Sequence, residues 1–99
     1  MLLKAGQDEV VIIEVSDEFV GSNYVWLSIR DLSGTELQKI QAAKISDNVY
    51  KAVVNLGEGE YLFYAYIGDS AGAEIDYIGS EYARVVKYEV EDLLKRAQL

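Results

Sequence analysis

Apolar and polar residues alternate along short runs of this chain, and this period of two limits its fold more than any other feature. In the run 24–30, Val25, Leu27 and Ile29 fall on one face of an extended strand. Similar runs occur at 10–15, 49–56 and 61–67, and a looser one covers 73–88 with a break at Gly79-Ser80. Such alternation is typical of half-buried β-strands. The sequence therefore predicts an all-β domain.

Glycine-containing segments at 31–34, 57–60 and 68–72 separate these runs and are expected to form turns. The stretch 35–44 is ambiguous. Its Leu37 and Ile40 are three residues apart and its composition favours helix, yet no apolar stripe is sustained. We expect either an irregular edge strand or a single helical turn there.

The period changes after residue 88. Val90, Leu93, Leu94 and Ala97 follow the i, i+3, i+4, i+7 spacing of one helix face. Acidic residues lie near the start of this segment and basic ones near its end, as the helix dipole favours. A helix of this length is not stable alone in water. We therefore expect a sandwich over 1–88 and a short C-terminal α-helix over 89–99 that packs on the domain or on a neighbouring subunit.

The composition restricts the chemistry. The chain has 99 residues, enough for a single domain, and contains no histidine, cysteine or proline. Serines without histidine lack an activating base, and the 17 acidic residues form pairs by chance at no defined separation. Calcium is weakly suggested by the oxygen-rich segment 68–74, which has no strong calcium-binding spacing. We expect no enzymatic activity, no cofactor and no metal site.

Charge and hydropathy restrict the partners. The net charge of −8 argues against binding to nucleic acid or to an anionic membrane, since both require a positive surface. The longest apolar stretch is far shorter than the roughly 18 residues of a membrane helix. The first residues include a charge where a signal peptide is apolar, so we expect neither a signal peptide nor a transmembrane segment.

The segment Leu56-Gly-Glu-Gly-Glu-Tyr61-Leu-Phe63 resembles the E–F corner of immunoglobulin-like and fibronectin type III-like domains. This resemblance implies an Ig-like antiparallel β-sandwich in which the Tyr61 hydroxyl bonds back to the corner backbone and Phe63 faces the core. Together with the 31–34 turn and Val49-Tyr50-Lys-Ala, the corner is also similar to small Ig-like domains of tailed-phage structural proteins. That similarity implies a subunit of a virion.

Several large side chains fall on the opposite, outer parity of two strands that are neighbours in an Ig-like sheet. These are Tyr24, Trp26, Arg30, Tyr64 and Tyr66. We expect them to form an exposed patch that binds a partner, because tryptophan, tyrosine and arginine are typical interface anchors. In that case Trp26→Ala weakens assembly and leaves monomer stability unchanged. The alternative is that the final strand or the C-terminal helix covers this face.

The preferred function is a non-enzymatic structural or accessory protein that binds partner subunits, either other proteins or copies of itself. The expected assembly is a bacteriophage virion, as a capsid, connector or tail component, and the expected location is the virion or the cytoplasm. One alternative is a carbohydrate-binding module that stacks sugars on the same aromatics, with Asn23, Asp69 and Asp76 available for the hydroxyls. Another is an acidic inhibitor that mimics nucleic acid.

Overall fold

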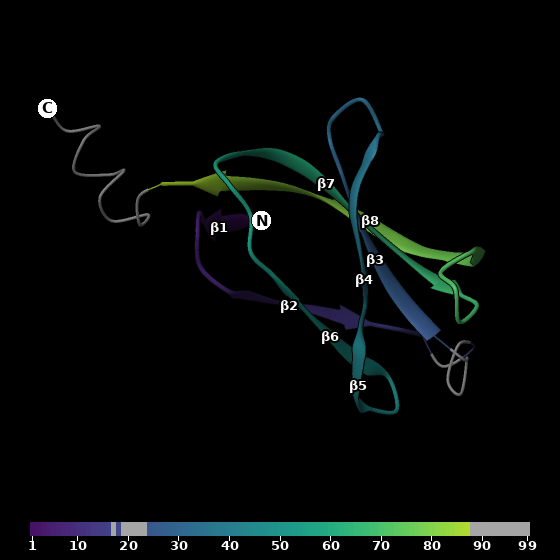
Figure 1. The fold of residues 1–99 in the computed structure, drawn as a ribbon. Helices are drawn as coiled ribbons and strands as arrows, with labels where there is room; N and C mark the ends of the chain where they lie inside the picture. The colour runs from purple at the N-terminus through teal and green to yellow at the C-terminus, as the bar shows by residue number, and fades with distance from the viewer. Residues whose placement is uncertain (17, 19–23, 88–99) are drawn as a thin grey trace, which may run out of the picture.

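A computed structural model describes residues 1–16, 18 and 24–87. Eight β-strands lie in this part of the chain, in two layers (Figure 1). They are β1 (Leu2–Lys4), β2 (Glu9–Glu14), β3 (Tyr24–Arg30), β4 (Glu36–Gln41), β5 (Ala43–Ser46), β6 (Val49–Val54), β7 (Gly59–Gly68) and β8 (Glu74–Val86). The predicted helix at 89–99 lies outside the described residues.

The strands form two sheets that pack as a sandwich. The larger sheet has the order β1-β8-β7-β3-β4, and the smaller has the order β2-β6-β5. Only β1 and β8 pair in parallel within these sheets, and every other pairing is antiparallel. The all-β sandwich predicted from the alternation is therefore confirmed.

The core lies between the sheets, on the faces that the alternation predicts. Val25, Leu27 and Ile29 of β3 point into it, and so do Phe63 and Ala65 of β7. The smaller sheet contributes every second residue of its two longer strands, namely Val11, Ile13, Tyr50, Ala52 and Val54. Both layers thus bury one apolar face against the other, which is the main source of stability in such a fold.

The ambiguous stretch 35–44 forms strands in both sheets. β4 lies at the edge of the larger sheet, and the chain then passes through Ala42 into β5 at the edge of the smaller one (Figure 1). Ala42 is buried, and its N–H donates to the Val25 carbonyl at 2.8 Å. The expected edge strand is confirmed and the helical turn is wrong. The helix propensity of these residues is outweighed by the backbone hydrogen bonds that β4 makes to β3 and β5 makes to β6.

Two of the predicted turns share one sequence pattern and one structure. Asp31-Leu-Ser-Gly34 and Asp69-Ser-Ala-Gly72 each have the glycine at positive φ, 92° and 87°. In both turns the glycine N–H donates to the backbone carbonyl of the aspartate. An aspartate at the first position and a glycine at the fourth are typical of such tight hairpin turns.

The last strand lies within the predicted run 73–88 and is continuous across Gly79-Ser80, where the sequence predicts a break. Instead, the β7–β8 register shifts at two other places, where Ile75 and Ile78 have no directly opposite residue. Each shift inserts one extra residue into β8, as a β-bulge does. β8 therefore stays paired with β7 over the length of both strands (Figure 1).

The segment 56–63 forms a tyrosine-centred corner between β6 and β7. The Tyr61 hydroxyl donates to the carbonyl oxygen of Gly57 at 2.9 Å, and Phe63 is buried in the core two residues later. A hydrogen bond of this kind holds the start of one strand against the loop that leaves the previous one.

Ile29 is fully buried at the centre of the core, so Ile29→Ala is expected to lower the free energy of unfolding by about 2–5 kcal/mol. The exposed Leu37→Ala on β4 is the control and is expected to change it by less than about 0.5 kcal/mol. Urea unfolding of both variants measures the difference. Equal losses would contradict the assignment of Ile29 to the core.

Candidate functional site

The outer face of the larger sheet carries the side chains that the sequence assigns to an interface. Trp26 of β3 lies opposite Tyr66 of β7, and Ser28 lies opposite Tyr64. Directly paired residues point to the same side of a sheet. None of the four belongs to the inner core cluster. The predicted outward parity of Trp26, Tyr64 and Tyr66 is thus confirmed.

The predicted exposure is wrong for two of these residues. Trp26 is 9% exposed and Tyr66 is 3% exposed, because the β7–β8 turn folds over them. The Trp26 indole Nε1 donates to the Asp69 carbonyl at 3.0 Å, and the Tyr66 hydroxyl donates to the Gly72 carbonyl at 2.6 Å. The Lys39 ammonium lies 5.6 Å from the centre of the Trp26 ring. A turn of the chain itself, and not the final strand, covers this part of the face.

Two glycines allow the turn to approach the aromatic rings. A Cβ atom at Gly68 would lie 2.7 Å from the Ala73 carbonyl oxygen and 2.9 Å from Trp26. A Cβ atom at Gly72 would lie 2.7 Å from the Lys39 ammonium, and Gly72 has a positive φ. Both positions therefore require glycine. In the sequence, the two glycines are the only sign that the turn lies close to other side chains, and they do not show which side chains these are.

The other half of the face is a network of polar and aromatic groups. The Arg30 guanidinium lies 3.9 Å from the centre of the Tyr64 ring, and its Nε donates to Ser28 Oγ at 3.0 Å. Ser28, which is fully buried, donates in turn to Glu36 at 2.6 Å. This chain of contacts satisfies the buried hydroxyl and holds the guanidinium over the ring.

Tyr64 makes further contacts with the start of β8. Its hydroxyl donates to a Glu74 carboxylate oxygen at 2.8 Å, and its ring centre lies 5.0 Å from that of Tyr77. The hydrogen bond to Glu74 raises the pKa of Tyr64 above its usual value, and burial raises the pKa of Tyr66. Both shifts favour the neutral phenol. The face is therefore a second packed layer, in which aromatic rings contact one another and donate hydrogen bonds to the β7–β8 turn and to Glu74.

These contacts leave little of the predicted patch open. Tyr24, Arg30 and Tyr64 are half-buried, and Trp26 has no free ring face for a sugar to stack on. Asp69 accepts hydrogen bonds within its own turn, and Asn23 lies outside the described residues. The remaining predicted interface residues, Val90, Leu93, Leu94 and Ala97, also lie outside them. An interface role for the half-buried residues stays a prediction.

A different face exposes large apolar side chains. On the outer side of the smaller sheet, Val10 of β2 lies directly opposite Val53 of β6, and Ile12 follows two residues after Val10. Their side chains are 58%, 45% and 51% exposed, in the order Val10, Val53, Ile12. We call these three residues the small-sheet patch. Sequence reasoning missed it, although the unbroken apolar run Val10–Ile13 gives β2 two apolar faces.

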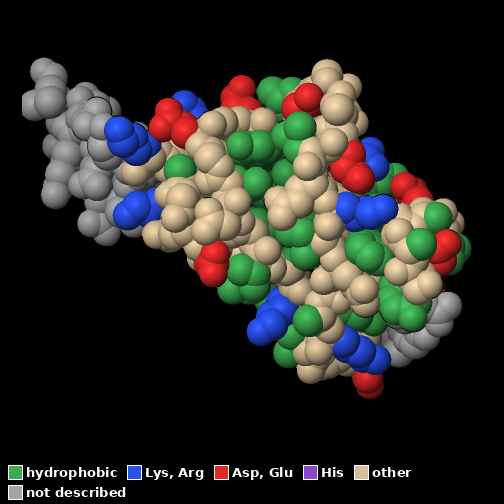
Figure 2. All heavy atoms as spheres, viewed as in Figure 1, with side chains coloured by type: hydrophobic (Ala, Val, Ile, Leu, Met, Phe, Trp, Pro, Cys, Tyr) green, Lys and Arg blue, Asp and Glu red, His purple; other side chains and the backbone are tan. Residues whose placement is uncertain are grey.

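Hydrophobic side chains also reach the surface in the middle of the view of Figure 2, with charged side chains mainly around them. Within residues 1–16, 18 and 24–87, no three acidic side chains gather in a way that would hold a metal ion. Among the same residues, no helix is long and apolar enough to cross a membrane.

Comparisons with known protein families, with curated proteins and with solved structures find no match to this chain.

Because Trp26 is buried, its replacement is expected to lower the stability of the monomer, whereas the sequence predicts no change in that stability. We expect Trp26→Ala to lower the free energy of unfolding of the monomer by about 3–5 kcal/mol, because it empties a packed layer and removes one of the two hydrogen bonds that the Asp69 carbonyl accepts. Urea unfolding followed by circular dichroism measures this. Ile75→Ala, at an exposed position of β8, is the control, and an equal effect of the two would contradict the packed layer.

The covering turn also predicts a pH dependence. Hydrogen bonds from the backbone N–H groups, first that of Ala73, lower the pKa of the Asp69 carboxyl in the folded chain. A lowered folded pKa contributes stability that is present above the unfolded value of about 4 and is lost as the pH falls through the folded value. Asp69→Asn keeps an acceptor oxygen and removes this titration. We therefore expect unfolding free energies of the wild type to fall more steeply below pH 4 than those of Asp69→Asn; parallel curves would contradict the assignment.

Proposed function

We propose that this sandwich is Ig-like. In such domains, strands B, E and D form one sheet and strands C, F and G the other, with an added strand beside C in the variable type. The orders β2-β6-β5 and β4-β3-β7-β8 follow the same sequence of neighbours, which supports the proposal. The hydrogen bond from Tyr61 at the start of β7 to the Gly57 carbonyl supports it as well, since strand F carries the equivalent tyrosine.

We propose further that the chain acts by binding, as a non-enzymatic structural or accessory subunit of a larger assembly. The small-sheet patch is the observation that carries this proposal. Val10, Ile12 and Val53 occupy neighbouring positions on one sheet face, where a free monomer would normally present polar residues. A partner that covers them removes this apolar surface from water.

A second copy of the chain is the partner that we propose for this face. Two charged residues, Glu14 of β2 and Lys51 of β6, lie on the same outer side as the patch, so the face is balanced in charge although the chain carries −8. Copies repel each other through most of their surface and least through a neutral face. A twofold arrangement lets Glu14 of one copy face Lys51 of the other.

The similarity to small Ig-like domains of tailed-phage structural proteins leads us to propose a virion as the assembly. Its subunits would be held by sheet faces of this kind. Many identical copies in one particle make a self-complementary face useful, because one surface then serves every contact of that type.

The mass of the full chain in solution, measured by sedimentation equilibrium over a range of concentrations, tests the self-association. We expect the wild type to dimerise and Val53→Lys to weaken the dimer by more than about tenfold, because it buries an unpaired ammonium at the contact.

Leu37→Lys is the matched control, since Leu37 is also an exposed aliphatic residue on a strand but lies on β4 of the other sheet. It is expected to leave the dimer unchanged. A wild type that remains monomeric at millimolar concentration, or equal effects of the two lysine variants, would contradict the proposal.

A further inference from the structure

A groove opens between the two sheets on the side where β2 and β8 lie. Its volume is about 290 Å³, and it reaches the core: its floor contains Val11, Ile13, Leu27, Phe63, Ala65 and Ile78. A cavity of about 150 Å³ already accommodates a group the size of benzene, so this groove has room for about two apolar side chains. Glu14, Ser80 and Glu81 are among the residues along its rim.

The groove exists because the strands on this side do not cover the sandwich. β1 pairs with β8 only over Arg84–Val86, which leaves the edge of β8 from Glu74 to Glu81 without a neighbouring strand in the described part of the chain. Within the same part, β2 pairs with β6 alone. Two sheet edges thus face each other across an apolar gap.

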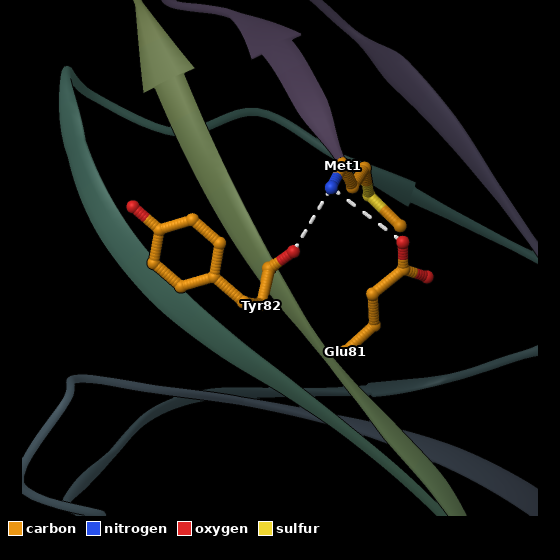
Figure 3. Close-up of polar contacts among 3 residues, drawn as sticks. All are labelled: Met1, Glu81 and Tyr82. Carbon is orange, nitrogen blue, oxygen red and sulfur yellow. Dashed lines mark hydrogen bonds and ion pairs between the residues drawn. The ribbon is translucent and has the colours of Figure 1, made fainter.

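Met1 marks one end of the groove. Its ammonium donates to the Tyr82 carbonyl at 3.1 Å and lies 3.5 Å from a Glu81 carboxylate oxygen (Figure 3). One oxygen of the Glu81 carboxylate therefore already has a cation beside it, and the ammonium offsets part of the negative charge of this wall. Glu14 stands on the opposite wall, so the charged groups along the groove (the Met1 ammonium, Glu14 and Glu81) carry a net negative charge.

The two edges differ in their readiness to pair. β8 carries its two bulges at Ile75 and Ile78, within the uncovered length, and bulges protect an edge from pairing. β2 pairs with β6 in an unbroken register from Glu9 to Glu14. Every second N–H and C=O of a regular antiparallel strand points away from its partner, so β2 offers a row of groups to a further strand.

We propose that this groove binds an extended segment of a partner protein, which adds as a β-strand to the free edge of β2. Alternate side chains of that segment are apolar and enter the groove, and the basic side chains between them point to the outer side of the smaller sheet, beside Glu14. Strand addition combines main-chain hydrogen bonds with pockets for alternate side chains, and the groove supplies both.

The charge of the rim selects this occupant over a second copy of the chain. The β2 edge of another copy would bring its own Glu9 and Glu14 towards Glu14 and Glu81, and like charges repel. The groove differs from the contact that we assign to the small-sheet patch, because Val10 and Val53 do not line it. Ile12 and Glu14 border both surfaces.

The test uses a blocked synthetic peptide in which valine alternates with lysine, and the Val53→Lys chain, so that self-association does not contribute. Binding is followed by NMR shifts of the backbone amides and by calorimetry. We expect the shifts to concentrate in β2 and in Ile78–Glu81. A peptide with glutamate in place of lysine is expected to bind at least about tenfold more weakly, since charge complementarity at this rim favours lysine.

Two N-methylated forms of the peptide test the main-chain contacts. Only one set of alternate N–H groups faces β2 in an added strand. We therefore expect methylation of one set to abolish binding and methylation of the other to leave it. Equal effects of the two forms, binding that is indifferent to charge, shifts outside the groove, or no binding would each overturn the proposal.

A variant that fills the groove with a side chain of the protein itself tests whether peptide binding needs this space. Gly79 pairs with the inward-facing Ala65, and a Cβ atom at Gly79 meets no atom within 4 Å, so Gly79→Leu projects into open space in the groove. We expect it to weaken peptide binding by more than about tenfold, because it occupies the volume that the valines need. Gly57→Leu, where a Cβ atom also meets nothing within 4 Å, is the matched control away from the groove. Equal binding by the two leucine variants would contradict the site.

Glu14→Lys provides a second variant that leaves the core untouched. It is expected to reverse the preference towards the glutamate peptide, and an unchanged preference would remove the role of the rim charge. Dimerisation through the small-sheet patch is measured without peptide on the wild-type chain. Failure of that dimer and failure of peptide binding are therefore separate results.

Discussion

The pairing of β3 with β7 is the interaction on which the rest of the structure depends. Every residue from Tyr24 to Arg30 has a partner on β7, and this strand pair is covered on both of its faces. The inner face meets the smaller sheet, and the outer face carries the aromatic layer under the β7–β8 turn. Ser28, a polar residue at the centre of this pair, is fully buried and remains satisfied through Glu36 and Arg30. β4 and β8 then attach to its two sides.

β2 differs from this central pair, because within the described chain one of its edges has no neighbouring strand and one of its faces is not covered. Its outward side chains Val10 and Ile12 are exposed, and its free edge borders the groove. One short strand thus belongs to both surfaces that we propose for binding. The two surfaces differ in chemistry: the face is apolar and balanced in charge, whereas the groove is apolar with an acidic rim. Both proposed contacts nevertheless include the Glu14 carboxylate, so the two surfaces meet at the end of β2.

The sequence was sufficient for features that depend on local alternation, and insufficient for those that depend on distant contacts. The period of two correctly assigned Val25, Leu27 and Ile29 to the core and Trp26 to the other face. It could not show that Asp69 and Gly72 would close over Trp26, because that contact joins segments more than forty residues apart. The groove was equally invisible, since it results from which strand edges lack a neighbour. The division of 35–44 between two sheets was ambiguous because edge strands carry weak patterns and depend on their neighbours.

The parallel pairing of β1 with β8 has a consequence for the order of folding. It joins Leu2 to Arg84, so β1 can pair with β8 only after nearly the whole described chain has been made. Contacts of such wide sequence separation form slowly, because the loop between them must be closed first. β1 is only three residues long, which limits the edge that it presents to other nascent chains while it waits. We therefore expect the hairpins β3–β4, β5–β6 and β7–β8 to form before β1 is attached.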